Sequence, residues 1–277
     1  MSASPGLIGD TAARDYSHKL RLFNAFAEPE LRRVIAGLEL KPGARVLDAG
    51  CGTGEVLRWI SDDVGPDGVI VGIDLARAHA AAARASAPSA ALVVQADLLK
   101  MPLRDGSLDL IWCMNTVNHL HDPVAGARQL ASLLRPAGRI ALCQSSVLPD
   151  MYFAWDARLE RLVNEAVRQY YRDRYGVSER DLAAVRSLVG VLRRAQLRHV
   201  RAQTFVIERV SPLGAADEAY LVEAIFRNTW ATRLQPYLSG DDYYELTRLC
   251  DPQHPQFALR RPDFHFLQTF TVVVGER

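Results

Sequence analysis

The chain has 277 residues with a formal net charge of +1, and 49% of them are hydrophobic. The near-neutral charge gives no reason to expect a nucleic acid or an anionic membrane as a partner. No apolar stretch reaches the about 18 residues that a membrane span needs. The four cysteines are scattered without metal-ligand spacing, so we expect no metal site and a reducing compartment, the cytoplasm.

The predicted elements begin with helices. Helical periodicity predicts one helix over Asp15–Ala27 and a second over Pro29–Leu38, after 15 loose residues. The first ten residues lack a basic region followed by an apolar one, so we expect no signal peptide. Pro42-Gly43 predicts a turn into the first strand. We therefore expect residues 1–42 to form a helical lid.

Strands and helices then alternate. Five apolar runs predict strands at Arg45–Asp48, Val69–Ile73, Ala91–Gln95, Leu108–Met114 and Arg139–Gln144. Helical patterns lie between them at Glu55–Ser61, Ala76–Ala87 and Val124–Leu134. Strands of this kind are buried on both faces, which predicts an open, mostly parallel sheet between two layers of helices.

The second half of the chain continues with longer helical patterns. Helices are predicted at Trp155–Tyr171 and Asp181–Gln196, and strands at Val200–Arg209 and Phe264–Val274. Between those two strands lies an insertion with helices at Ala215–Leu234 and Asp241–Leu249, the second with Ser239 as its N-cap. We expect a single domain over residues 1–277, with a core at 43–210, the insertion at 211–262 and the last strand at 263–277.

A glycine turn follows the first strand. Asp48 is followed by Gly50, Gly52 and Gly54, and a helical pattern begins directly after them. Glycine lets a ligand approach the backbone closely, and a helix start offers unpaired N–H groups. The turn therefore predicts a site for a nucleotide-like ligand, with Asp48 orienting the turn through its backbone amides.

Acidic residues follow the next two strands. Asp74 stands 20 residues beyond Gly54, where a carboxylate accepts hydrogen bonds from ribose hydroxyls. Asp97 follows the third strand and can accept from an exocyclic amine such as that of adenine. The alternatives are a helix N-cap for Asp74 and a loop aspartate for Asp97. Because ligands of open sheets lie at the carboxyl ends of the strands, these residues are expected to meet.

Residues 45–146 closely resemble the class I S-adenosylmethionine-dependent methyltransferases of the small-molecule type, including those of quinone and natural-product biosynthesis. The resemblance rests on V-L-D-A-G-C-G-T-G at 46–54, I-D-L at 73–75, Q-A-D-L-L-K-M-P-L-R-D-G-S-L-D-L-I-W at 95–112 and L-L-R-P-A-G-R-I at 133–140. It implies a Rossmann-like, seven-stranded, mostly parallel α/β sheet whose last strand is antiparallel and lies beside strand five. It also implies S-adenosyl-L-methionine as cofactor and S-adenosyl-L-homocysteine as product.

The resemblance carries expectations for single residues. Gly50, Cys51 and Gly52 would lie against the methionine part of the cofactor. The ribose and adenine would contact the segments after strands two and three, which are Asp74-Leu75 and Ala96-Asp97-Leu98. Asn115 would face the sulfonium, and Tyr16 in the lid would close over the cofactor.

Methyl transfer is an in-line displacement, so the protein mainly has to align the acceptor and exclude water. A general base helps when the acceptor atom carries a proton. His119, just after strand four, is our candidate for that base or for orienting the acceptor; a structural histidine is the alternative. His121, beside Asp122-Pro123, fits the structural interpretation better.

The acceptor pocket is expected where the lid meets the insertion. Candidate residues are His18, Tyr152, Trp155, Arg227 and Trp230. The aromatic ones can instead fill the insertion's own core. A cap of this size favours an enclosed, organic small-molecule acceptor, with methylation at O, N or C, over a polymer in an open groove. A secondary metabolite and a homodimer are expected, with no nucleic-acid partner.

Two other functions stay open on the sequence. One is a protein that binds S-adenosylmethionine without methyl transfer, as a cyclase, a decarboxylase-like enzyme or a regulatory module. The other is a dinucleotide-dependent oxidoreductase, although the spacing here is G-x-G-x-G and not G-x-G-x-x-G.

Overall fold

The computed structural model describes residues 16–145, 151–153, 156–176 and 184–277. One mixed sheet runs through the molecule in the order β3-β2-β1-β4-β5-β8-β6, and β7 pairs with β8 off this path. The strands are β1 (Arg45–Ala49), β2 (Val69–Asp74), β3 (Ala91–Gln95), β4 (Leu108–Met114), β5 (Leu134–Ser145), β6 (Met151–Phe153), β7 (Arg198–Val210) and β8 (His265–Glu276).

The pairing confirms the predicted fold class. Strands β1 to β5 are parallel to one another, and β8 inserts antiparallel beside β5, with Val273 opposite Leu142. The short β6 was not predicted. It adds an eighth strand by pairing antiparallel with β8 through Tyr152 and Leu267.

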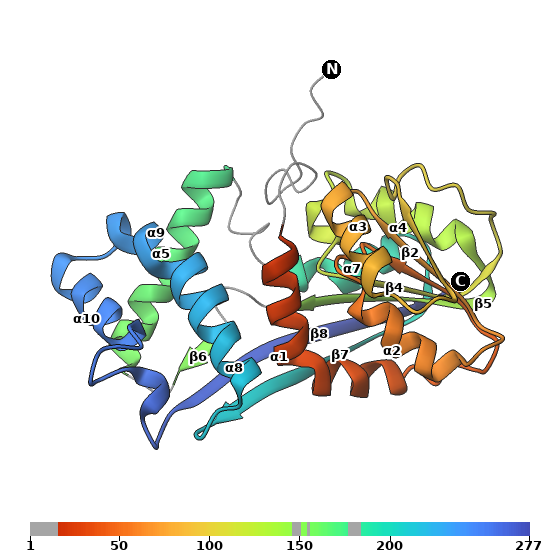
Figure 1. Cartoon of the computed structure of the whole chain (residues 1–277). Coiled ribbons are helices and arrows are strands. Elements are labelled where there is room, and N and C mark those ends of the chain that lie inside the picture. Colours follow the sequence, from red (N-terminus) through yellow and green to blue (C-terminus); the bar gives the residue numbers. More distant parts are fainter. Residues whose placement is uncertain (1–15, 146–150, 154–155, 177–183) are drawn as a thin grey trace.

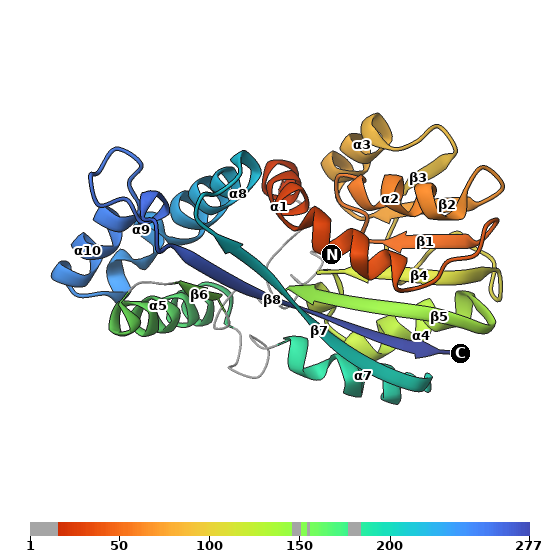
Figure 2. The same cartoon turned by 90° about the horizontal axis from the view of Figure 1, so that it is seen from below.

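Helices cover both faces of the sheet (Figures 1 and 2). Alternate strand residues explain why: Val46 and Trp112 pack on one side and Leu47 and Ile111 on the other, all fully or almost fully buried. The first side carries α1 (Ser17–Ala36), α2 (Glu55–Val64) and α3 (Arg77–Ser86), and the second carries α4 (Pro123–Leu133) and α7 (Leu188–Arg194).

The lid contains one helix where two were expected. Helix α1 continues from Ser17 to Ala36 through Pro29. A proline inside a helix removes one backbone hydrogen bond. That bond would have gone to the Ala25 carbonyl. Beside this gap, the Arg209 side chain donates to the Phe26 carbonyl and to the Glu30 carboxylate, and so contacts α1 on both sides of the proline. The boundary placed at Pro29 was therefore wrong, because a contact from β7 supports the helix there.

A second group of elements, which we call the cap, comes from residues 151–176 and 211–262. It contains β6, α5 (Ala157–Tyr175), α8 (Ala215–Ala219), η3 (Tyr220–Trp230), α9 (Ala231–Leu234), η4 (Gln235–Tyr237), α10 (Gly240–Cys250) and η5 (Ala258–Arg260). Figure 1 shows α1 between the cap and the rest of the sheet, and Figure 2 shows β7 and β8 running from one part into the other.

The predicted helix Ala215–Leu234 is broken into three. Its middle part, η3, is a π-helix, in which the Thr229 hydroxyl donates to the Ala224 carbonyl five residues back. Ala231 then has φ +27°, which ends the regular turn. Ser239 caps α10 as predicted, because its hydroxyl accepts from the Asp242 amide.

Three smaller expectations were tested. The helix predicted over Asp181–Gln196 consists, from residue 184 onward, of the 3₁₀ turn η2 (Ala184–Ser187) and α7; residues 181–183 lie outside the described ranges. Strand β5 begins at Leu134, five residues before the predicted start. In the described part of the chain, no helix has the length and apolarity to cross a membrane.

Candidate functional site

The glycine turn after β1 is held by the end of β2. Gly50 and Cys51 both donate their amides to the Ile73 carbonyl, at 2.7 and 2.9 Å, and Gly52 donates to Asp74 Oδ2 at 2.9 Å. The expectation that Asp48 orients these amides was therefore wrong. A side chain on Gly50, with φ +83°, would collide with Thr116, because an added Cβ lies 2.2 Å from its Oγ1.

Asp48 instead has a buried carboxylate, one oxygen of which has no hydrogen-bond partner among the described residues. Its side chain is 2% exposed, and Oδ2 accepts no hydrogen bond within the described structure. Burial raises the pKa of Asp48 well above its usual value, and the neighbouring carboxylates of Asp74 and Glu55 raise it further. A cationic ligand group would relieve this repulsion, so the site is suited to a positively charged ligand.

Asp74 links three segments. Its Oδ2 accepts from Gly52, its Oδ1 accepts from the Ala76 amide at 2.9 Å, and His79 Nδ1 lies 3.3 Å from Oδ1. His79 Nε2 in turn accepts the Tyr16 amide at 3.1 Å. Because Nε2 accepts a hydrogen bond, Nδ1 is the ring nitrogen that carries a proton, and it faces the Asp74 carboxylate. Asp74 is not the N-cap of α3, which is Ala76, but it accepts the Ala76 amide directly before the helix. A ligand role stays compatible with these contacts, since Oδ2 keeps a second lone pair.

The ends of β3 and β4 complete this edge of the sheet. Asp74 pairs in register with Gln95, so the following Ala96 and Asp97 lie beside it. Asp97 is half-buried and accepts from the Leu99 amide, as the loop interpretation predicted, while Leu98 is buried. Leu75 is 47% exposed at the same edge, where an apolar side chain can cover an aromatic ring.

Asn115 and His119 follow β4. Asn115 has φ +50° and accepts the amide and hydroxyl of Ser145 at the end of β5. His119 ends the 3₁₀ turn η1 (Val117–His119), and its Nδ1 is buried without a hydrogen bond in the ranges described. Burial lowers the pKa of His119, and the charge of Asp74 opposes that shift. A neutral imidazole with an unused acceptor nitrogen is a competent base.

Helix α1 covers the glycine turn. An added Cβ on Gly52 would lie 3.0 Å from Leu20 Cδ1, so Leu20 sits directly above this glycine. Asn24 donates to Glu55 at 2.8 Å and so joins the lid to the start of α2. Tyr16 joins it to α3 through His79. The lid is therefore attached to the sheet edge at three points.

The predicted acceptor residues differ in exposure and in what they contact. His18 contacts Glu223 of η3, with 2.6 Å between Nε2 and Oε2, and both side chains are largely exposed. Arg227 is exposed, whereas Trp230 is 3% exposed and stacks on Phe226 inside the cap. Tyr152 is the middle residue of β6, and Trp155 lies outside the described residues. Their roles toward an acceptor stay predictions.

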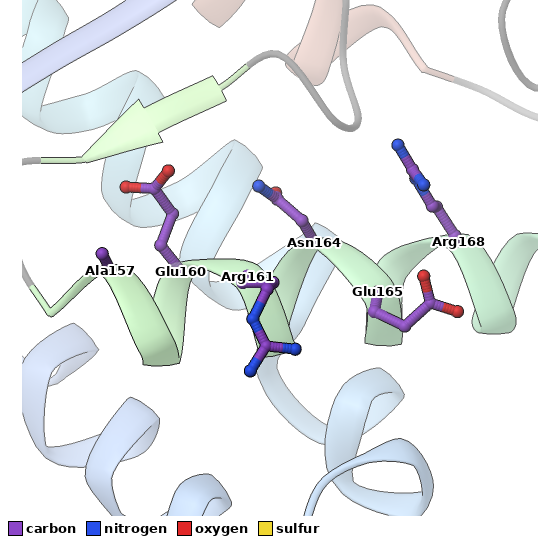
Figure 3. A pocket seen from close by; sticks show the side chains of 6 residues that line it. All are labelled: Ala157, Glu160, Arg161, Asn164, Glu165 and Arg168. Carbon is purple, nitrogen blue, oxygen red and sulfur yellow. The ribbon is translucent and has the colours of Figure 1, made fainter.

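A depression of about 400 Å³ lies on helix α5, lined by Ala157, Glu160, Arg161, Asn164, Glu165 and Arg168. Figure 3 shows that Glu160, Asn164 and Arg168 point to the side of the helix that faces β6. All six residues belong to one helix, and none of the strand-end residues takes part. The depression is therefore separate from the glycine turn.

Sequence reasoning missed several residues of the site. His79 lies in an alanine-rich helix, and Ser145 carries no motif. Their roles depend on contacts between elements far apart in the chain, so no local pattern indicates them. Cys51 is in the turn as predicted, but burial raises the pKa of its thiol, which keeps it from acting as a nucleophile.

Residues 47–142 match the family described as "Methyltransferase domain". The chain is 33% identical over 124 residues to 27-O-demethylrifamycin SV methyltransferase of Amycolatopsis mediterranei, covering 43% of this chain and 44% of that protein. It is 37% identical over 121 residues to nocamycin O-methyltransferase of Saccharothrix syringae, covering 42% and 43%. The matches span less than half the length of these curated relatives.

Among solved structures, the chain resembles the putative methyltransferase in the complex with the Haloferax volcanii Trm112 methyltransferase activator. The TM-score is 0.55 at 17% identity, over 95% of this chain and 98% of that one. This likeness confirms the fold. Together with the family match over the glycine turn and the strands that follow it, these findings show that residues 47–142 are similar to a methyltransferase domain.

Proposed function

We propose that this protein transfers a methyl group from S-adenosylmethionine to an O, N or C atom of a small organic molecule. The observation that carries the proposal is the glycine turn, which donates to Asp74 beside the buried Asp48 carboxylate, whose Oδ2 has no partner among the described residues. Asp97 and Asn115 follow the neighbouring strands β3 and β4. The ammonium and sulfonium of S-adenosylmethionine supply the positive charge that this acidic site favours. The family match and the two methyltransferase relatives support the same assignment.

The residues present fit this cofactor, which supplies a methyl group already activated by the positive sulfur. Asp74 would accept from the ribose hydroxyls, and Asp97 with Leu98 would hold the adenine. Leu20 and Tyr16 would exclude water from above the turn, which favours the reaction by orientation and desolvation. When the acceptor atom carries a proton, His119 Nδ1 would take it as the new bond to carbon forms.

The relatives that act on rifamycin and nocamycin precursors support a secondary metabolite as the acceptor. The large cap supports an enclosed acceptor site formed with the lid. A cytoplasmic location is supported by the free thiols of Cys51, Cys113, Cys143 and Cys250. A homodimer stays a prediction, which light scattering after size-exclusion chromatography checks.

Thermal unfolding with S-adenosylhomocysteine tests the cofactor, and tritium transfer from labelled S-adenosylmethionine tests the reaction. A ligand at 100 times its Kd stabilises by about 2.7 kcal/mol, which corresponds to a Tm increase of about 5 °C for a chain of this size. NAD should give none. Stabilisation by NAD alone would overturn the proposal, and cofactor binding without transfer to any acceptor would support a non-methylating protein.

Asp48→Asn provides a sharp internal test. An acid whose pKa is raised in the folded state makes the protein less stable as pH rises from the unfolded value of about 3.9 through the folded one. The variant should therefore raise the Tm of the free protein at pH 7 by about 2 °C or more. It should also shrink the stabilisation by S-adenosylhomocysteine, since the carboxylate no longer offsets the ligand's ammonium. A lower Tm of the free variant would contradict this account of Asp48.

A further inference from the structure

Lys19 lies on α1 where the lid meets both the glycine turn and the cap. The next residue, Leu20, sits above Gly52. Lys19 Nζ itself points toward the end of η3, 3.4 Å from Thr229 Oγ1. The Thr229 side chain is buried and donates its own proton to the Ala224 carbonyl. The ammonium of Lys19 therefore lies where the lid contacts the cap, one residue before Leu20, which covers the turn.

Among the described residues, this ammonium has no anionic partner. No carboxylate of the described residues lies within 4.0 Å of Lys19 Nζ. Burial lowers the pKa of Lys19 to about 8, and the positive charge of Arg233 lowers it further. A half-buried cation that is near a second cation and one hydroxyl is poorly compensated.

Arg233 is the second cation. It belongs to α9, and its guanidinium lies 5.6 Å from the ring centre of Tyr170 of α5. Within the described ranges it too lacks a carboxylate partner. The charge of Arg233 also affects Tyr171. Burial raises the pKa of this phenol to about 12, and the positive charge of Arg233 opposes that rise. Tyr16 of the lid also raises the pKa of Tyr171, which puts this phenol near the same junction. With its raised pKa, the phenol keeps its proton and can donate a hydrogen bond.

We infer that Lys19 and Arg233 bind an anionic group of the methyl acceptor, a carboxylate, at the junction of α1, α5 and α9. The inference rests on the proposed methyl transfer and narrows its substrate class to acidic small molecules. Tyr171, as a protonated phenol, is placed to donate to the same group. Because Lys19 adjoins Leu20 above the glycine turn, an acceptor held here by its acidic group would lie next to the methyl donor.

The charge state of Lys19 favours this role over that of a base. A group with a pKa of about 8 is mainly protonated at pH 7, so it serves as a cation. An anion beside it would raise the pKa again, since an opposite charge stabilises the ammonium. Affinity for an acidic acceptor should consequently fall when the pH rises above 8.

Lysine-selective NMR tests the inference directly, because the chain has lysines only at 19, 41 and 100. With ¹³C-lysine and saturating S-adenosylhomocysteine, one ε-methylene signal should titrate near 8 and disappear in Lys19→Arg. Benzoate is the probe and benzamide its neutral match. Benzoate should move the Lys19 titration upward by about one pH unit, and benzamide should not. Equal effects of the two probes would overturn the inference, as would a Lys19 titration that ignores benzoate.

Methyl-transfer kinetics provide a second test of the anion site. A panel of hydroxylated aromatic acids is compared with their primary amides by tritium transfer at pH 7. Lys19→Met should lower kcat/KM for a methylated acid at least tenfold, through KM, while Lys19→Arg retains most of it. Arg233→Gln should lower it as well. Lys41→Met is the matched control, because Lys41 is exposed on the loop before β1 and should change nothing.

The two proposals fail in different ways. No transfer to any compound, with no stabilisation by S-adenosylhomocysteine, would reject methyl transfer. Transfer to amides as fast as to acids, with equal kcat/KM in wild type and Lys19→Met, would keep methyl transfer and reject the anion site. A rate that rises above pH 8 and is lost in Lys19→Arg would make Lys19 a base, which also rejects the anion site.

Discussion

Burial gives His119, at the end of β4, the properties of a base near neutral pH. Its pKa is lowered because the protonated ring is poorly solvated there, and Nδ1 has no partner in the described structure. A base works only when unprotonated, so the rate should fall as pH drops through a value below the usual 6.5.

We therefore expect His119→Gln to reduce kcat by about 100-fold or more and to abolish that acid limb. The dissociation constant of S-adenosylhomocysteine should stay near the wild-type value. His121→Gln is the comparison, since His121 was assigned a structural role. A wild-type pH profile in His119→Gln would mean that the acceptor needs no base from this side chain.

The site residues differ in whether their positions and roles could be predicted from the sequence. Asp74 and Asp97 were predictable because they follow apolar strands at a known spacing, and the structure places them after two paired strands, with Asp74 opposite Gln95. His79 and Lys19 were not, because their meaning depends on α1 crossing between two distant segments. Asp48 was located correctly, but its environment of buried carboxylates requires the three-dimensional arrangement.

At the scale of elements, Arg209 of β7 joins the lid to the cap. It forms ion pairs with Glu30 of α1 at 2.8 Å and with Asp217 of α8 at 2.7 Å, and its guanidinium lies 4.8 Å from the ring centre of Phe26. All three charged side chains are less than 20% exposed. These contacts surround the point where Pro29 interrupts the hydrogen bonding of α1.

Arg209→Met should lower the free energy of unfolding by about 3 kcal/mol, because it leaves two buried carboxylates unpaired. Arg209→Lys should recover only part of this, since one ammonium cannot serve both carboxylates and the Phe26 carbonyl. Denaturant unfolding measures both. Arg261→Met is the control: its pair with Asp263 is exposed, and such pairs contribute less than about 1 kcal/mol. Equal losses in the two variants would contradict a special role for Arg209.

Elements were predictable where one local pattern controls them. The apolar strands and the helix after the glycine turn appear within a few residues of their expected ends. Predictions failed where contacts between distant elements decide: α1 passes through Pro29 with the help of Arg209, and η3 widens into a π-helix around Thr229. The strand β6 exists because β8 is long enough to pair beyond β5.

At the scale of the whole molecule, α1 is in contact with both parts. On the sheet side it reaches Gly52, Glu55 and His79, and on the cap side it reaches Glu223 and Thr229. It also contacts Arg209 of β7, which runs between the two parts. Ligand contacts at the glycine turn therefore act on the same helix that borders the proposed acceptor site. The His79 ring is the shortest connection, since it joins the lid backbone to the carboxylate expected to bind ribose.

Hydrogen exchange can measure this connection. In wild type, S-adenosylhomocysteine should slow amide exchange in the first turns of α1, residues 17–20, and leave α10 unchanged, because α10 lies at the far end of the cap (Figure 1). His79→Phe keeps an aromatic ring but removes the hydrogen bond from Tyr16 and the polar contact with Asp74. The protection of residues 17–20 should therefore be lost and ligand affinity should fall about tenfold, as the loss of about 1.4 kcal/mol allows. His79→Gln, which can still accept and donate, should restore part of both. If His79→Phe bound the ligand with normal protection of α1, the lid would respond to the ligand directly, through Leu20 or Tyr16, and the histidine would be only a packing residue.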